Sequence, residues 1–279
     1  MNITQPIYTL SINVNNCNAE IWCNDVILFE FKPLSTQNQG LSITIPINQL
    51  ILKQSEFEIK AVITPSFRKE TLLESSFVHL QLSVKSKTNN KNSFRLLELK
   101  TPNAIDEENP LNIKDVKTLE GLPSYELLGV YKDKILPFEA LGWTESVNLL
   151  KQNPQSLLTQ GFKFFKNLET IINNKQIPQF IKLNEDKNRL LKETLYLTNE
   201  QHEKCKIEDI TLLIDKGYKL IPIDFDNIEH VLMGRGRLLK LRRKNGLSLI
   251  VLNNPHKKSS AEFDIKLHKK TANSDFSII

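Results

Sequence analysis

The stretch AEIWCNDVILFEF, residues 19–31, decides the fold class predicted for the first part of the chain. Short apolar or alternating runs lie on either side of Asn24 and Asp25, which is the pattern of two β-strands joined by a tight turn. Asn and Asp suit this turn because their side chains bond to the local backbone and tolerate left-handed conformations. The stretch therefore predicts an antiparallel hairpin.

Neighbouring stretches repeat this pattern of Ile, Val, Phe and Thr between Asn-, Ser- and Gln-rich breaks: YTLSINV (8–14), LSITIPI (41–47), FEIKAVI (57–63), FVHLQLSV (77–84) and a last short strand, FRLLELK (94–100). This many short strands at such spacing favour a β-sandwich. The sequence predicts an all-β sandwich domain over residues 1–105, which ends in a polar segment interrupted by Pro102 and Pro110.

Two segments carry a family resemblance, IWCNDV (21–26) and INQLILKQSEFEIKAVI (47–63). They resemble galactose-binding-like jelly-roll modules, in which a Trp-x-Asn-Gly hairpin is followed by a Leu-Leu-Lys-x-Gly-x-Asn turn. Asp25 stands where the family has glycine, while Ser55 and Phe57 replace the glycine and asparagine of the second turn. The resemblance covers about the first 90 residues. It implies a jelly-roll sandwich, with sugar binding as one alternative and with Trp22 expected in the core.

The remaining residues, 106–279, are predicted to form an α+β domain with helices packed on an antiparallel β-meander. A crossing segment is expected over 106–143, helices over about 144–216 and the sheet over about 218–268. Apolar residues recur with helical spacing at positions 157, 158, 162, 165, 168, 171 and 172. Further helices are expected over 179–197 and 198–217. Asn245-Gly246 predicts a type I′ hairpin turn within the meander.

Charge is concentrated in the C-terminal part of the chain. Residues 235–270 hold eleven Lys and Arg against Glu262 and Asp264, a local charge of +9. The rest of the chain holds 26 basic (37 − 11) and 30 acidic (32 − 2) residues, so the formal net charge of +5 conceals a polarised molecule. Polarity of this kind favours an anionic partner.

The candidate binding residues lie in MGRGRLLKLRRKNG (233–246): Arg235, Arg237, Lys240, Arg242 and Arg243. Three interpretations stay open, namely a solvated hairpin with a charged edge, a surface for an acidic patch on another protein, and a nucleic-acid or phosphate site. We do not expect nucleic acid, because no aromatic residue interleaves with the basic ones.

No complete catalytic, metal or nucleotide motif occurs, so we predict no catalytic residue, metal ion or cofactor. His202 and Cys205 are spaced to face each other on a helix, but a nucleophilic thiol also needs an oriented base and an oxyanion donor. Asp224 and Asp226, with Glu229 and His230 nearby, are divalent-ion candidates, although turn chemistry explains the two aspartates as well.

The sequence predicts a cytoplasmic protein, since no secretory signal and no membrane-spanning apolar run is present. Cys17, Cys23 and Cys205 are expected as reduced thiols, with a Cys17–Cys23 disulfide as the alternative. The leading functional hypothesis is a non-catalytic protein-interaction protein, in its most concrete form a bacterial toxin-neutralising (immunity) protein. The alternative is a carbohydrate-binding accessory protein or an enzyme with a β-sandwich module. The oligomeric state is left open.

Overall fold

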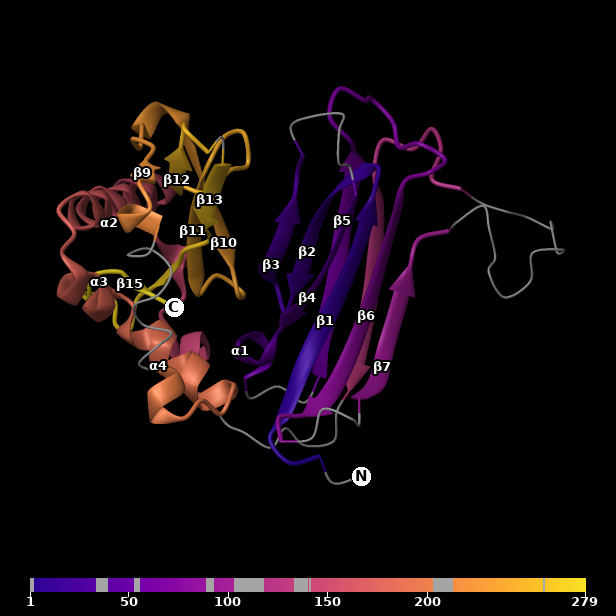
Figure 1. Cartoon of the computed structure of the whole chain (residues 1–279), viewed down its shortest axis with the longest axis horizontal. Helices are drawn as coiled ribbons and strands as arrows, with labels where there is room; N and C mark the ends of the chain where they lie inside the picture. Colours follow the sequence, from indigo (N-terminus) through magenta and orange to yellow (C-terminus); the bar gives the residue numbers. More distant parts are fainter. Residues whose placement is uncertain are drawn as a thin grey trace, which may run out of the picture. The chain divides into compact units, whose positions relative to one another are not determined.

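The computed structural model describes residues 3–33, 40–52, 56–88, 93–102, 118–132, 140, 142–202, 213–257 and 259–279. The chain divides into two compact units, Met1–Glu139 and Ala140–Ile279. Figure 1 shows the long strands of the first unit and the mixed helices and strands of the second. No helix among the described residues is long and apolar enough to cross a membrane.

The N-terminal unit contains two four-stranded antiparallel sheets, so the prediction of a sandwich-like β-unit is confirmed. One sheet has the order β4 (Gly40–Pro46), β1 (Pro6–Asn15), β6 (Phe77–Ser86), β7 (Ser93–Lys100), and the other has the order β3 (Val26–Phe31), β2 (Cys17–Cys23), β5 (Glu56–Pro65), β8 (Tyr125–Lys132). A short helix, α1 (Asn48–Ile51), follows β4.

Strict alternation along the strands places one face of each sheet in the core. Leu10 and Ile12 of β1 and Ile21 and Ile59 of the second sheet are all at most 1% exposed. The intervening residues of β1, β2 and β5 are partly or fully exposed. The period-two pattern of the sequence therefore decided which side chains form the core.

The tight turn predicted at Asn24-Asp25 is present between β2 and β3. Both residues have positive φ, 50° and 61°, as a type I′ hairpin requires. Asn24 also ties the turn to its surroundings: its Nδ2 donates to the carbonyl of Leu50 (2.9 Å), and its Oδ1 accepts from the backbone N–H of Glu58 (3.0 Å). Asn suits this position because its amide side chain can donate one of these hydrogen bonds and accept the other.

Strand β8 corrects the expected domain boundary near residue 105. Its residues were assigned to the crossing segment of the second domain, but β8 pairs with β5 in an unbroken register from Glu56↔Lys132 to Ile63↔Tyr125. The first compact unit accordingly continues to Glu139. The pairing joins residues that lie 62 (Ile63 to Tyr125) to 76 (Glu56 to Lys132) positions apart in sequence, which local patterns do not specify.

The C-terminal unit is a mixture of helices and antiparallel sheets, as expected. Its helices are α2 (Pro154–Asn173), α3 (Ile177–Leu183) and α4 (Glu185–Thr194), with single 3₁₀ turns η1 (Gly142–Glu145), η2 (Leu149–Lys151) and η3 (Phe225–Asn227). Residues 203–212 of the helix expected over 198–217 lie outside the described residues.

The single meander predicted after residue 218 is wrong, because the strands form two sheets. One has the order β10 (Ile228–Met233), β11 (Leu238–Arg243), β14 (Lys266–His268), β15 (Ser277–Ile278), and the other has the order β13 (Ser259–Phe263), β12 (Ile250–Asn254), β9 (Lys219–Leu220). A turn at Asn245-Gly246 connects them, but only Gly246 has a positive φ (86°), so it is not type I′.

The core of this unit lies between α2 and the sheets. Leu157, Phe165 and Leu168 of α2 are buried in one cluster with Leu239 and Leu241 of β11, which confirms the predicted apolar face. Gly161 permits this close packing, since a β-carbon there would lie 2.9 Å from Cδ1 of Leu241. Helix α2 begins at an N-cap whose Asn153 side chain accepts a hydrogen bond from the backbone N–H of Ser156 (3.1 Å).

Candidate functional site

The predicted basic residues lie on the β10–β11 hairpin, and most of them donate hydrogen bonds or form ion pairs within the C-terminal unit. Arg235 lies exposed in the connecting turn. Arg237 donates from Nη1 to the carbonyl oxygen of Ser146. Arg243 donates from Nη2 to three carbonyl oxygens, those of Pro222 (3.1 Å), Ile221 (3.4 Å) and Leu249 (3.4 Å). These two arginines therefore hold loops of their own unit in place.

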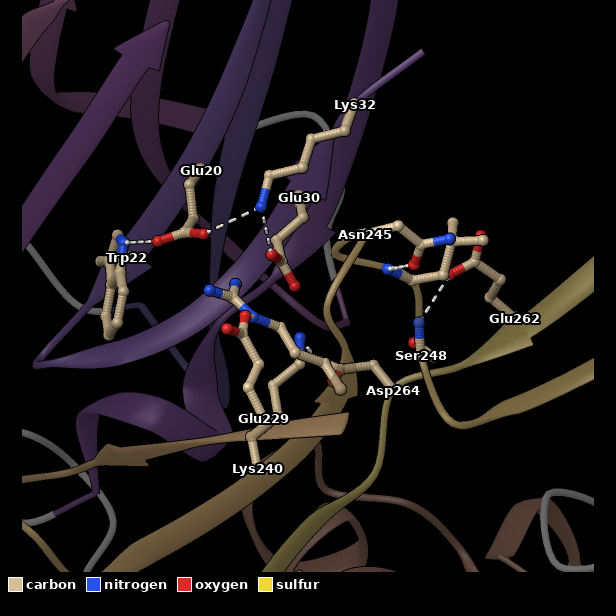
Figure 2. A network of polar contacts seen from close by, with 12 residues as sticks. Glu20, Trp22, Glu30, Lys32, Glu229, Lys240, Asn245, Ser248, Glu262 and Asp264 are labelled. Atoms are coloured by element: carbon tan, nitrogen blue, oxygen red, sulfur yellow. Dashed lines mark hydrogen bonds and ion pairs between the residues drawn. The ribbon is translucent and has the colours of Figure 1, made fainter. Parts of the chain in front are cut away.

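Lys240 and Arg242 form ion pairs with carboxylates of the same unit. Lys240 is 3% exposed, and its Nζ lies 3.0 Å from Oδ1 of Asp264, as Figure 2 shows. Lys266 pairs with the other oxygen of Asp264, and Arg242 Nε donates to Oε1 of Glu229 at 2.6 Å. Burial alone raises the pKa of Asp264, but the two ammonium groups outweigh it and lower the pKa to about 2.

These contacts correct the interpretation of the basic segment as a charged outer surface. Lys240 is buried on β11 beside Asp264, and Arg237, Arg242 and Arg243 also donate to acidic or carbonyl groups within the unit. A charge that is neutralised by an internal carboxylate attracts an external anion far less. The +9 already counts Asp264, and carboxylates from outside residues 235–270 reduce it further, because Glu229 pairs with Arg242 and Asp186 pairs with Lys270.

A second polar cluster joins residues that sequence reasoning did not connect. Ser146 Oγ lies 2.7 Å from Nδ1 of His268, and Nε2 of His268 lies 3.3 Å from Oδ2 of Asp186. Ser277 Oγ donates to the same carboxylate oxygen (3.1 Å), and Lys270 Nζ lies 2.7 Å from Oδ1. The cluster links the segment after η1, the first turn of α4, and the ends of β14 and β15.

The electrostatics of this cluster fix its protonation states. Burial raises the pKa of Asp186, but the contacts with Lys270, Ser277 and His268 lower it overall, so Asp186 is a carboxylate. Burial lowers the pKa of His268, and the nearby cations Lys270 and Arg189 add to this, against the opposing effect of Asp186. A neutral His268 then donates a hydrogen bond from Nε2 to Asp186 and accepts one at Nδ1 from the Ser146 hydroxyl.

Serine, histidine and aspartate in this sequence of contacts are the components of an activated nucleophile. A nucleophile must also reach its substrate, and Ser146 is 2% exposed while His268 and Asp186 are 3% and 5% exposed. The arrangement therefore acts as a buried polar connection between three parts of the unit. Sequence reasoning missed it because the three residues come from distant segments without a shared motif.

The candidate metal ligands Asp224 and Asp226 lie in a turn, where a side-chain oxygen of one bonds to the backbone of the other. Oδ1 of Asp224 accepts from the backbone N–H of Asp226 (3.2 Å) at the start of η3, which is the turn role considered for them. Within the described residues, no group of three or more His, Cys, Asp or Glu is placed to hold a metal ion. Cys205, the partner predicted for His202, lies outside the described residues.

Cys17 and Cys23 of β2 are free and buried, so the alternative of a disulfide between them is not observed. Both side chains point into the sandwich with Ala19 and Ile21. Burial raises the pKa of the Cys17 thiol to about 12 and raises that of Cys23 as well. Thiols of this kind are poor nucleophiles and behave as small apolar side chains.

Trp22 corrects the expectation of a core tryptophan, because it lies on the outward side of β2. Its indole N–H donates to Oε1 of Glu20 (3.0 Å), and Lys60 Nζ lies 5.0 Å from the ring centroid. Figure 2 shows the neighbouring contacts of Lys32 with Oε2 of Glu20 (3.2 Å) and with Oε1 of Glu30 (2.9 Å). An aromatic ring and several charged groups therefore share this face.

The same sheet exposes aliphatic side chains on β8. Leu128 is 59% exposed and Val130 is 44% exposed. In the register with β5, Leu128 lies opposite Lys60 and Val130 lies opposite Glu58. Two neighbouring apolar side chains are thus exposed among charged ones on this face of the sheet.

Comparison with known proteins yields no match, whether with family models, with curated proteins or with solved structures. The function is therefore inferred from the residues and contacts described above.

Proposed function

We propose that the chain is a non-catalytic protein-interaction protein that uses the outward face of β5 and β8 to contact its partner. The supporting observation is the pair of exposed aliphatic side chains, Leu128 and Val130, within a row of charged residues. Protein interfaces combine an apolar centre with a polar rim in this way. Neutralisation of a bacterial toxin in the cytoplasm, an immunity role, is the most specific form of the proposal.

The charges around the aliphatic pair bear on the kind of partner. Glu58 and Lys60 alternate along β5 beside Val130 and Leu128, so both signs border the apolar centre. A partner surface with an apolar centre and mixed charges fits this face better than a purely acidic patch, because the basic hairpin residues are largely paired within their own unit. Nucleic acid is not proposed as a partner for the same reason.

Affinity capture from extracts of the native host tests the proposal with three forms of the full chain. The wild type retains one stoichiometric protein partner, and the double variant Leu128→Ser/Val130→Thr loses it. Truncating central apolar contacts commonly costs about 2 kcal/mol or more, roughly a thirtyfold loss of affinity. The control is Ile43→Ser on β4, which changes an equally aliphatic residue that is 37% exposed on the other sheet. Equal capture by all three forms would contradict the proposed surface.

A carbohydrate-binding role is a second candidate, and the outward position of Trp22 favours it. Sugar sites pair an aromatic ring with carboxylate and amide groups, and Trp22 has Glu20 beside it and Lys60 near its ring. The hairpin that contains Trp22 is also the segment that resembles galactose-binding-like modules, so the jelly-roll assignment belongs to this candidate.

A glycan screen by thermal shift separates the two candidates. A ligand that binds only the folded chain raises its unfolding temperature, and the rise grows with the logarithm of the ligand concentration relative to the dissociation constant. The glycan candidate predicts such a rise for the wild type and its loss in Trp22→Ala, while Leu128→Ser/Val130→Thr keeps it. A response that persists in Trp22→Ala would remove Trp22 from the site.

A further inference from the structure

Strand β8 lies at one end of its sheet, so no described strand is hydrogen-bonded to its outer backbone edge, although Leu97 and Leu99 of β7 lie against Gly129. Such an edge offers a row of N–H and C=O groups to another strand unless the protein blocks it with proline, a bulge or charges. β8 has an unbroken register with β5 and contains no proline. By contrast, the pairings of the edge strands β3 and β7 each contain a register shift.

The outward side chains of β8 form a self-complementary series: Glu126, Leu128, Val130 and Lys132. When two copies of the strand lie antiparallel with Gly129 opposite Gly129, residues whose numbers sum to 258 face each other. Glu126 then lies opposite Lys132 of the second copy, and Leu128 lies opposite Val130 of the second copy. Every outward pair is an opposite-charge pair or an aliphatic pair, and both kinds stabilise antiparallel sheets.

The neighbouring strand continues this match across the sheet. Lys132 already pairs with Glu56 of β5 at 2.8 Å, and both side chains are more than half exposed. In the two-fold arrangement Lys132 lies between Glu56 of its own chain and Glu126 of the other. The remaining edge strand, β4, has a regular register but no charged side chain that would select a pairing.

We propose that two copies of this chain pair along β8 to form a continuous eight-stranded sheet, with Gly129 on the two-fold axis. Main-chain hydrogen bonds supply the attraction, and the Glu126–Lys132 pairs set the direction and register. The proposal concerns the backbone edge, whereas the proposed partner surface concerns the outward face of the same sheet. Pairing would place the aliphatic residues of both copies side by side in the middle of that face.

Charge exchange tests the pairing in the full chain by sedimentation velocity over a concentration series at low salt. The wild type is expected to sediment as a dimer at high concentration. Glu126→Lys and Lys132→Glu each create two like-charge pairs in the homodimer, and each should raise the dimer dissociation constant about tenfold or more. The triple variant Glu56→Lys/Glu126→Lys/Lys132→Glu exchanges all the charges that meet at Lys132, including its partner within the same chain, and restores dimerisation.

Mixing gives a sharper result, since the two single variants complement each other. An equimolar mixture of Glu126→Lys and Lys132→Glu forms two opposite-charge pairs and should dimerise although each variant alone does so weakly. Ser42→Lys, which adds a charge to the edge strand β4, is the control and should leave dimerisation unchanged. Circular dichroism checks that every variant is folded.

A wild type that stays monomeric at all concentrations would overturn the proposal, as would single variants that dimerise like the wild type. Dimerisation that Ser42→Lys abolishes, or that the charge exchange fails to restore, would place the contact elsewhere. The protein-interaction function is tested separately by capture, so a monomeric chain that still retains a partner refutes only the pairing.

Discussion

Replacement of Asp186 by alanine should lower the free energy of unfolding of the C-terminal unit by about 4 kcal/mol. Asp186 is 5% exposed and accepts hydrogen bonds from Nε2 of His268 and from Ser277. Without the carboxylate these donors lose their acceptor, and a buried unsatisfied donor costs about 1–3 kcal/mol. The cost for His268 lies at the upper end of this range because the residue is 3% exposed, and the cost for Ser277 lies at the lower end because that residue is only partly buried.

The cationic partners of Asp186 contribute less. Lys270 and Arg189 are 57% and 62% exposed, so water replaces the carboxylate when it is removed. Exposed ion pairs of this kind contribute at most about 1 kcal/mol. The position of Asp186 in the first turn of α4 adds a few tenths of a kcal/mol through the helix dipole. These contributions together support an effect of about 4 kcal/mol.

Urea unfolding followed by circular dichroism measures this effect by linear extrapolation. Glu185→Ala is the matched control, since Glu185 is an exposed acid in the same turn of α4 and should change stability by at most about 0.5 kcal/mol. A loss below about 1 kcal/mol for Asp186→Ala, or equal losses for both variants, would refute a structural role of the Ser146–His268–Asp186 contacts.

Three further predictions follow from the same structure. The pKa of His268 is lower in the folded chain than in the unfolded chain, so the unfolded chain binds a proton first and the free energy of unfolding should decline below about pH 6.5. Asp264 adds a second loss of stability from about pH 4 down toward its folded pKa of about 2. In a pH series of urea unfolding midpoints, His268→Gln should remove only the first decline. Cys17 and Cys23 of β2 should resist thiol reagents in the native protein, whereas all three cysteines should react in denaturant. Only one reactive thiol per chain in denaturant would reveal a disulfide. A fragment of residues 1–139 should unfold cooperatively whereas 1–105 should not, because the shorter fragment lacks β8; cooperative unfolding of 1–105 by calorimetry would contradict this.

Local patterns in the sequence determined the elements of this protein. Period-two alternation identified the strands of the sandwich, and helical spacing identified the buried face of α2. The turn at Asn24-Asp25 was also predictable, because its left-handed backbone restricts which residues fit. These features depend on neighbouring residues, so an isolated stretch of sequence contains them.

Only the tertiary structure decided which strands pair and which charges meet. The pairing of β8 with β5, the division of the C-terminal strands into two sheets and the contact of Ser146 with His268 all join distant segments. The basic hairpin shows the consequence for function. Its charge was visible in the sequence, but the carboxylate beside Lys240 lies on a segment that only folding brings near it. A charge acts on its surroundings through the partners it has in space, and spacing along the chain does not contain that information.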